Sequence, residues 1–144
     1  AAVAVLAGTG DEARVLLMQS AGKTSHGLWS LAMGGLELGE TASQAAAREL
    51  TEETAIVATE LYNSGCCDTF YNQKSNTIDI TPIFVACFAE APQVTIDQEH
   101  LAFCWASFAE AQEMLAFPGQ RQAMVEIERD FARREPPSFR LIKA

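Results

Sequence analysis

Four charged side chains that could do chemistry together lie within six consecutive positions, from Arg48 to Glu53. The run 41–53 lacks Gly and Pro and is rich in Ala, Glu and Gln, which predicts a helix. On a helix Glu49, Glu52 and Glu53 share one face. Carboxylates this close repel and raise one another's pKa, unless a cation lies between them. Mg²⁺ binds carboxylates together with substrate phosphates, so the pattern indicates a Mg²⁺ site for a phosphorylated substrate.

The alternative is an acidic helix facing solvent, in which Arg48 pairs with Glu52 one turn away. That interpretation leaves the preceding segment unexplained, because residues 34–40 combine three glycines with two glutamates. Thr41 or Gly39 is the candidate N-cap of the helix, and Glu40 places negative charge at the positive end of the helix dipole.

The glycine-rich segment and the helix together resemble the signature of the Nudix family. That signature reads G, five residues, E, seven residues, R-E-U, one residue, E-E, one residue, G, U, where U is a bulky aliphatic residue. The matching positions in this chain are Gly34, Glu40, Arg48, Glu49, Leu50, Glu52, Glu53 and Ile56. Ala55 stands at the second glycine position, and we expect it to change how the helix ends, since Gly adopts the left-handed conformation cheaply.

A second departure lies upstream, where the family often reads Leu-Pro-Gly-Gly and this chain has Leu-Ala-Met-Gly at residues 31–34. Neither departure removes a carboxylate. The resemblance implies an α/β (α+β) fold. Its expected architecture is an α/β/α sandwich with a mixed β-sheet. The resemblance also implies hydrolysis of a nucleoside diphosphate linked to another group.

The resemblance assigns roles to the residues of the signature. Glu49, Glu52 and Glu53 would hold Mg²⁺, with Mn²⁺ as a substitute, and Gly34 would let the backbone approach the metal. Arg48 and Glu40 would orient the carboxylates and the loop.

The stretch 97–105, which reads DQEHLAFCW, resembles a segment of the bacterial dihydroneopterin triphosphate pyrophosphatases, also described as dATP pyrophosphohydrolases. In that group the Glu before His-Leu-Ala is a metal ligand, which implies the same role for Glu99. One of Glu49, Glu53 and Glu99 would take the proton from the attacking water. For His100 a structural role is the expectation. The run 119–123 is also similar to that group.

Three functions remain open on the sequence. The first is a pyrophosphohydrolase that cleaves a nucleoside or pterin triphosphate to a monophosphate and pyrophosphate. The second is a Nudix hydrolase of ADP-ribose, a sugar nucleotide or a dinucleotide. The third is a non-catalytic ligand sensor, against which the intact carboxylates argue. Lys23, in a polar loop, and Trp29 are secondary candidates for substrate contact; the simpler interpretations are a solvated loop and a core aromatic.

From the composition, the expected binding partners are small molecules. A formal net charge of −9 argues against a nucleic-acid polymer as partner. No apolar run has the length of a membrane span. The four cysteines form no CxxC pair, which is typical of reduced thiols in a cytoplasmic protein. A homodimer is one assembly left open.

The elements expected around the site belong to one domain over residues 1–144. Strands are expected at 2–7 and 14–19, paired as a hairpin, and at 28–31, 56–62, 66–71, 77–88 and 94–96. Pro82 predicts an edge, bend or bulge. Helices are expected at 108–116 and 120–134, separated by Pro118 and Gly119. The tail 138–144 has no assigned role.

Overall fold

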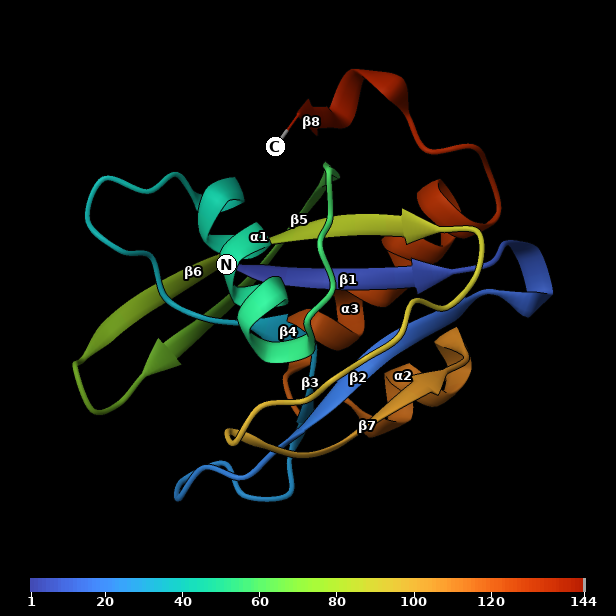
Figure 1. Cartoon of the computed structure of the whole chain (residues 1–144). Coiled ribbons are helices and arrows are strands. Elements are labelled where there is room, and N and C mark those ends of the chain that lie inside the picture. Colours follow the sequence, from blue (N-terminus) through green and yellow to red (C-terminus); the bar gives the residue numbers. More distant parts are fainter. Residues whose placement is uncertain (144) are drawn as a thin grey trace.

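The computed structural model of the chain describes residues 1–143, which form one mixed β-sheet with helices on both faces (Figure 1). The strands are β1 (Ala2–Ala7), β2 (Arg14–Ser20), β3 (Trp29–Ser30), β4 (Ala32–Met33), β5 (Glu60–Asn72), β6 (Thr77–Phe88), β7 (His100–Ala106) and β8 (Leu141–Lys143). The helices are α1 (Ala42–Thr54), α2 (Phe108–Met114) and α3 (Pro118–Ile127), the last continued by a π-helical turn at Glu128–Ala132. The predicted sandwich with a mixed sheet is confirmed.

Strand β1 is the centre of the sheet. Every residue of its sequence, AVAVLA, is buried, as expected for a strand covered on both faces. It pairs in parallel with β6 and antiparallel with β2, which confirms the predicted hairpin. Its first two residues also pair with β4. The strand order is β3-β2-β1-β6-β5-β8, with β7 on β2 and β4 on β1.

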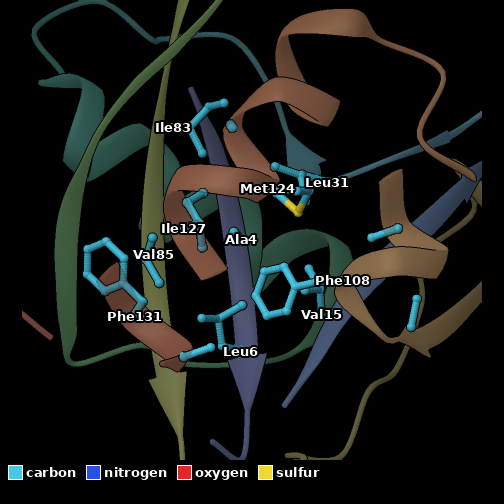
Figure 2. Close-up of a cluster of buried hydrophobic side chains, with 14 of the residues drawn as sticks. Ala4, Leu6, Val15, Leu31, Ile83, Val85, Phe108, Met124, Ile127 and Phe131 are labelled. Atoms are coloured by element: carbon cyan, nitrogen blue, oxygen red, sulfur yellow. The ribbon is translucent and has the colours of Figure 1, made fainter. Parts of the chain in front are cut away.

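One helix covers one face of the sheet, and two helices cover the other face. On one face, Ala45, Ala46 and Leu50 of α1 pack against Val3 and Val5 of β1. On the other face, α2 and α3 cover the alternate residues of β1. Figure 2 shows this second cluster, in which Phe108, Met124, Ile127 and Phe131 surround Leu6, Val15 and Val85.

A switch of pairing partner brings the glycine-rich segment to the site. β3 pairs with β2, whereas β4 pairs with β1, and Leu31 lies between them. The Leu31 N–H donates to Oε1 of the fully buried Gln120 at 3.0 Å. This side chain satisfies a backbone donor at the switch, as buried N–H groups require. The chain then leaves β4 beside the last turn of α1.

Helix α1 begins and ends almost where the sequence predicts. Thr41 is the N-cap, and its hydroxyl and the Gln44 side chain form a reciprocal capping box. At the other end Ala55 adopts the left-handed conformation, with φ 62°, and its N–H donates to the Thr51 carbonyl. The expectation of an altered helix ending is therefore wrong, because Ala takes the conformation usually left to Gly, at a cost of roughly 1–2 kcal/mol.

The predicted strands between α1 and β6 need correction. Instead of strands at 56–62 and 66–71 there is one long strand, β5, with a register shift between Asn63 and Cys67. Gly65, at φ 78°, lets the strand continue through this bulge. Pro82 lies opposite it, paired with Cys67, which confirms the bulge predicted there.

Other boundaries also differ. Residues 94–96 form no strand, because Val94 and Ile96 pack on the α1 face while the chain crosses to β7. β7 and β8 were not predicted as strands, and β8 pairs with the start of β5. Pro118 begins α3 as its first residue instead of only ending α2, since its fixed φ suits that position. No helix within residues 1–143 is both long enough and apolar enough to cross a membrane.

Replacing Ala55 by Gly should raise the free energy of unfolding by about 1 kcal/mol, because Gly adopts a positive φ without steric cost. Urea unfolding measures the change. The matched control is Ala47→Gly inside α1, which should lower stability by about 1 kcal/mol. A loss of stability in Ala55→Gly would contradict the strain that we assign to this position.

Candidate active site

Arg48 ties the glycine-rich loop to the carboxylates of α1. Its Nε donates to Glu40 Oε1 at 2.6 Å, and Nη2 donates to Glu40 Oε2 at 3.0 Å and to the Gly35 carbonyl at 2.9 Å. Nη1 donates to Glu49 Oε1 at 2.8 Å and to Glu52 Oε2 at 3.2 Å. The hydrogen bonds from Arg48 hold the pKa of Glu40 down at about 2. The guanidinium therefore links Glu40 to two neighbouring carboxylates of the helix.

Gly34 lets the Glu49 carboxylate approach the backbone. A Cβ atom on Gly34 would overlap the carboxylate carbon and both oxygens of Glu49. A Cβ on the adjacent Gly35 would meet nothing within 4 Å. Only the first glycine of the pair is thus required by the packing of the site.

Glu53 is more deeply buried than Glu49 and Glu52 and is 2% exposed. Its Oε1 accepts from the Met33 N–H of β4 at 3.2 Å. Burial, followed by the charge of Glu49, raises the pKa of Glu53 to about 8. The shift arises because a carboxylate removed from water favours its neutral form.

The segment 97–100 completes this side of the site. His100 Nε2 lies 3.2 Å from Glu53 Oε2, and His100 Nδ1 lies 2.8 Å from Asp97 Oδ1. The Glu99 N–H donates to the same Asp97 oxygen at 3.2 Å, and the Glu99 carbonyl accepts from the Ala21 N–H at 2.8 Å. The exposed side chain of Glu99 is thereby placed at the rim between two hollows.

We call the first hollow the acidic cleft. It has a volume of about 770 Å³ and is lined by Gly34, Arg48, Glu49, Glu52, Asp97 and Glu99, among others. The second, the side cavity, has a volume of about 570 Å³ and is lined by Ser20, Lys23, Leu28, Glu53, His100 and Phe117, among others. Met33, Gln98 and Glu99 line both. The two hollows therefore lie side by side.

The structure brings together most of the residues that the sequence singles out. Glu40, Arg48, Glu49, Glu52, Glu53, Glu99 and Gly34 form one site, and Lys23 lies on the wall of the side cavity. Trp29 does not reach it: among residues 1–143 neither hollow is lined by Trp29, which packs on the core face of α2 and α3.

Sequence reasoning gave no role to Asp97 and Gln120 and only a structural role to His100. Asp97 and His100 flank the predicted ligand Glu99, and Gln120 lies in the run 119–123 that carries part of the resemblance. The only sequence feature that could have indicated these residues is their position inside segments that resemble the family. Their partners, Glu53 and Leu31, are distant in the chain, so no local pattern reveals the contacts.

The donors of the acidic cleft fit a hard divalent cation. Carboxylate oxygens are the ligands that Mg²⁺ prefers, and Arg48 is the one cationic side chain lining the cleft among residues 1–143. Over the same residues no three acidic, His or Cys side chains converge on one point as a metal would require. Instead, Arg48 contacts Glu49 and Glu52, whereas Met33 and His100 contact Glu53. A cation would compete with Arg48 for these oxygens.

Replacing Gly34 by Ala should displace the Glu49 carboxylate and weaken Mg²⁺ binding by about tenfold or more. Calorimetric titration of the folded protein measures the affinity. Gly35→Ala is the matched control and should bind Mg²⁺ as the wild type does, since its methyl group meets open space. Equal affinities for both variants would show that Gly34 is not needed for the carboxylate to reach its place.

In metal-free buffer, we expect the burial of Glu53 to lower stability as the pH rises. The unfolded chain releases this proton near pH 4.5, whereas the folded protein keeps it to about pH 8. Between these values the unfolded state binds fewer protons, so the group's contribution falls by at most about 1.4 kcal/mol per pH unit. Glu53→Gln should lack this decline, and its advantage over the wild type should grow up to pH 8 and then level off.

Urea unfolding at several pH values in EDTA tests this prediction. All other titrating groups are present in both proteins, so the difference between the two curves isolates Glu53. A difference that does not change between pH 5 and pH 8 would contradict a raised pKa for this carboxylate.

Comparison with known proteins agrees with this geometry. The family model described as the NUDIX domain matches residues 1–127. An octanoyltransferase of Myxococcus xanthus is 33% identical over 129 residues, which are 85% of this chain and 34% of that protein, so the chain spans about a third of its length. The structure of the Escherichia coli dihydroneopterin triphosphate pyrophosphohydrolase has a TM-score of 0.73 and 26% identity, covering 91% of this chain and 93% of the other.

A Caenorhabditis elegans Ap4A hydrolase has a TM-score of 0.75 at 18% identity, covering 89% of this chain and 93% of the other, which supports the fold alone. The family match includes the glycine-rich loop, all of α1 and the segment that carries Glu99. The chain therefore belongs to the Nudix family.

Proposed function

We propose that this Nudix hydrolase cleaves a nucleoside or pterin triphosphate to a monophosphate and pyrophosphate with Mg²⁺, for which Mn²⁺ can substitute. The observation that carries the proposal is that the acidic cleft and the side cavity are adjacent and share Met33, Gln98 and Glu99 in their walls. A substrate with a polyphosphate at one end and a ring at the other fits this shape. The phosphates would lie beside the carboxylates and the ring in the side cavity.

The carboxylates would hold the metal that offsets the charge of the phosphates. Glu49, Glu52 and Glu53 supply ligands from α1, and Glu99 supplies one from its loop. Bound Mg²⁺ neutralises phosphate charge and lowers the pKa of bound water. One of Glu49, Glu53 and Glu99 accepts the proton of the attacking water. Arg48 and Glu40 position these groups without touching the substrate, since their hydrogen bonds are already made within the loop and the helix.

The walls of the side cavity support a ring with polar edges. Leu28 and Phe117 provide apolar surface, and Ser20, Ser25 and Lys23 provide hydrogen-bonding groups. Such a lining is typical of small-molecule sites, where apolar contact gives affinity and a few polar groups give orientation. The similarity of residues 97–105 to the dihydroneopterin triphosphate group favours the same substrate class.

A Nudix hydrolase of ADP-ribose, a sugar nucleotide or a dinucleotide is the second candidate. The two adjacent hollows favour it as well, because a dinucleoside polyphosphate also places a nucleoside beside a phosphate chain. A ligand sensor is less favoured, because every carboxylate of the signature is present, with Glu49 and Glu52 on the acidic cleft and Glu53 on the side cavity. The free cysteines of the described residues support a reducing compartment such as the cytoplasm.

Product analysis decides among these functions. The protein is incubated with dNTPs, dihydroneopterin triphosphate, ADP-ribose and sugar nucleotides, with Mg²⁺ and with EDTA. We expect pyrophosphate from a triphosphate only when Mg²⁺ is present. Glu53→Gln should abolish this turnover while remaining folded, and Glu99→Ala should lower it less, because Glu99 comes from an exposed loop. Nucleotide binding without turnover of any substrate would move the assignment to the sensor.

A further inference from the structure

His100 occupies a place that the predicted structural role does not explain. Its side chain is 10% exposed and lies between two carboxylates, Glu53 of α1 and Asp97 of the preceding loop. A histidine buried only for packing has no need of two acidic neighbours, each aligned with a different ring nitrogen. The contact between Nδ1 and Asp97 fixes the orientation of the ring. Nε2 is then held in a fixed position that faces Glu53.

The backbone of β7 is irregular at the point that aims this ring. Gln19 pairs with Ala102, but the next residue, Ser20, pairs with His100, so Leu101 is an extra residue in β7. Residues directly opposite in an antiparallel pair share a face. Ser20 has the parity of Leu16 and Met18, which pack on the α1 face.

Without the extra residue His100 would follow the alternation of Cys104 and Ala106, which face α2 and α3. The bulge therefore turns His100 towards α1, where Glu53 lies. Bulges commonly re-aim side chains beside active sites. The local geometry of β7 serves this one contact.

The same contact joins the two sources of predicted metal ligands. Glu53 belongs to α1, and Glu99 belongs to the loop before β7. Asp97 accepts from the Glu99 N–H and contacts His100, and His100 contacts Glu53. His100 is thus the side chain that connects the outer ligand's loop to the buried carboxylate.

We propose that His100 is a positioning residue that, aligned by Asp97 and aimed by the β7 bulge, holds Glu53 and the Glu99 loop in the relative placement that a divalent cation needs. The inference rests on the proposed function for the identity of these ligands. Groups that orient metal ligands typically contribute 10–100-fold to metal affinity. His100 should therefore affect metal affinity directly and substrate affinity little.

The test compares two substitutions, each of which can replace only one of the two ring nitrogens of His100. His100→Gln can place an amide group near the position of Nε2 and keep the contact with Glu53. His100→Asn can reach Asp97, as Nδ1 does, but not Glu53. The matched control is His26→Asn, because His26 is the other histidine and lies exposed in the loop after β2. Mn²⁺ affinity of each folded protein is measured by the paramagnetic signal of free Mn²⁺.

We expect His100→Asn to weaken Mn²⁺ binding by about tenfold or more, with His100→Gln and His26→Asn close to the wild type. With a hydrolysed nucleotide at saturating Mg²⁺, His100→Asn should lower kcat more than it raises KM. Thermal unfolding checks that each variant is folded. Glu53→Gln, combined with His100→Asn, should weaken Mn²⁺ binding no further than Glu53→Gln alone, since the two act through one carboxylate.

Unchanged Mn²⁺ affinity in His100→Asn would overturn the inference. If KM rose at the same time, His100 would instead contact the substrate from the wall of the side cavity. A wild-type protein that binds Mn²⁺ but hydrolyses nothing would refute the proposed function alone, because the comparison of Mn²⁺ affinities needs no turnover.

Discussion

The site depends on the removal of the Glu53 carboxylate from water. A buried carboxylate is costly unless donors or cations surround it. Two separate parts of the chain meet this requirement: β4 supplies the Met33 N–H, and the start of β7 supplies His100. The sheet and α1 are therefore fixed relative to one another partly by a single acidic group.

The second constraint is the balance of charge on the outer side of α1. Arg48 is shared among Glu40, Glu49 and Glu52, and it also binds the Gly35 carbonyl. The Arg48 guanidinium stabilises the loop, and a metal cation can replace its bonds to Glu49 and Glu52. Its two bonds to Glu40 are the ones that need not change, because Glu40 does not line the acidic cleft. The loop can thus stay in place while the helix carboxylates turn to a new partner.

Local sequence was enough to predict α1, its N-cap and the shared helix face of Glu49, Glu52 and Glu53. Helical spacing places Glu49, Glu52 and Glu53 on one face, and this does not depend on distant residues. The sequence also placed β1, β2 and β6, because their apolar runs are long and bounded by turns. It divided β5 at Gly65, because a glycine between two β-rich runs looks like a break when nothing shows the strand opposite.

The contacts of His100, Gln120 and Met33 could not be predicted, since each depends on chain segments that meet only in the folded sheet. The bulge in β7 reverses the alternation that a period of two would give for His100. The pairing switch at Leu31 likewise follows from competition between β1 and β2 for one strand. Such features are set by tertiary geometry, and a residue pattern records them only through resemblance to a family.

The loop after β2 has a consequence for how this family member can diversify. Its ends are joined by backbone hydrogen bonds between Ser20 and both Gly27 and Leu28, and the Ala21 N–H donates to the Glu99 carbonyl. Between these points Ala21, Gly22, Lys23 and Ser25 line the side cavity, and the loop contributes no carboxylate. Insertions or exchanges there leave β2 and β3 in register. The wall of the side cavity therefore comes from a segment that can change in sequence separately from the carboxylates of α1.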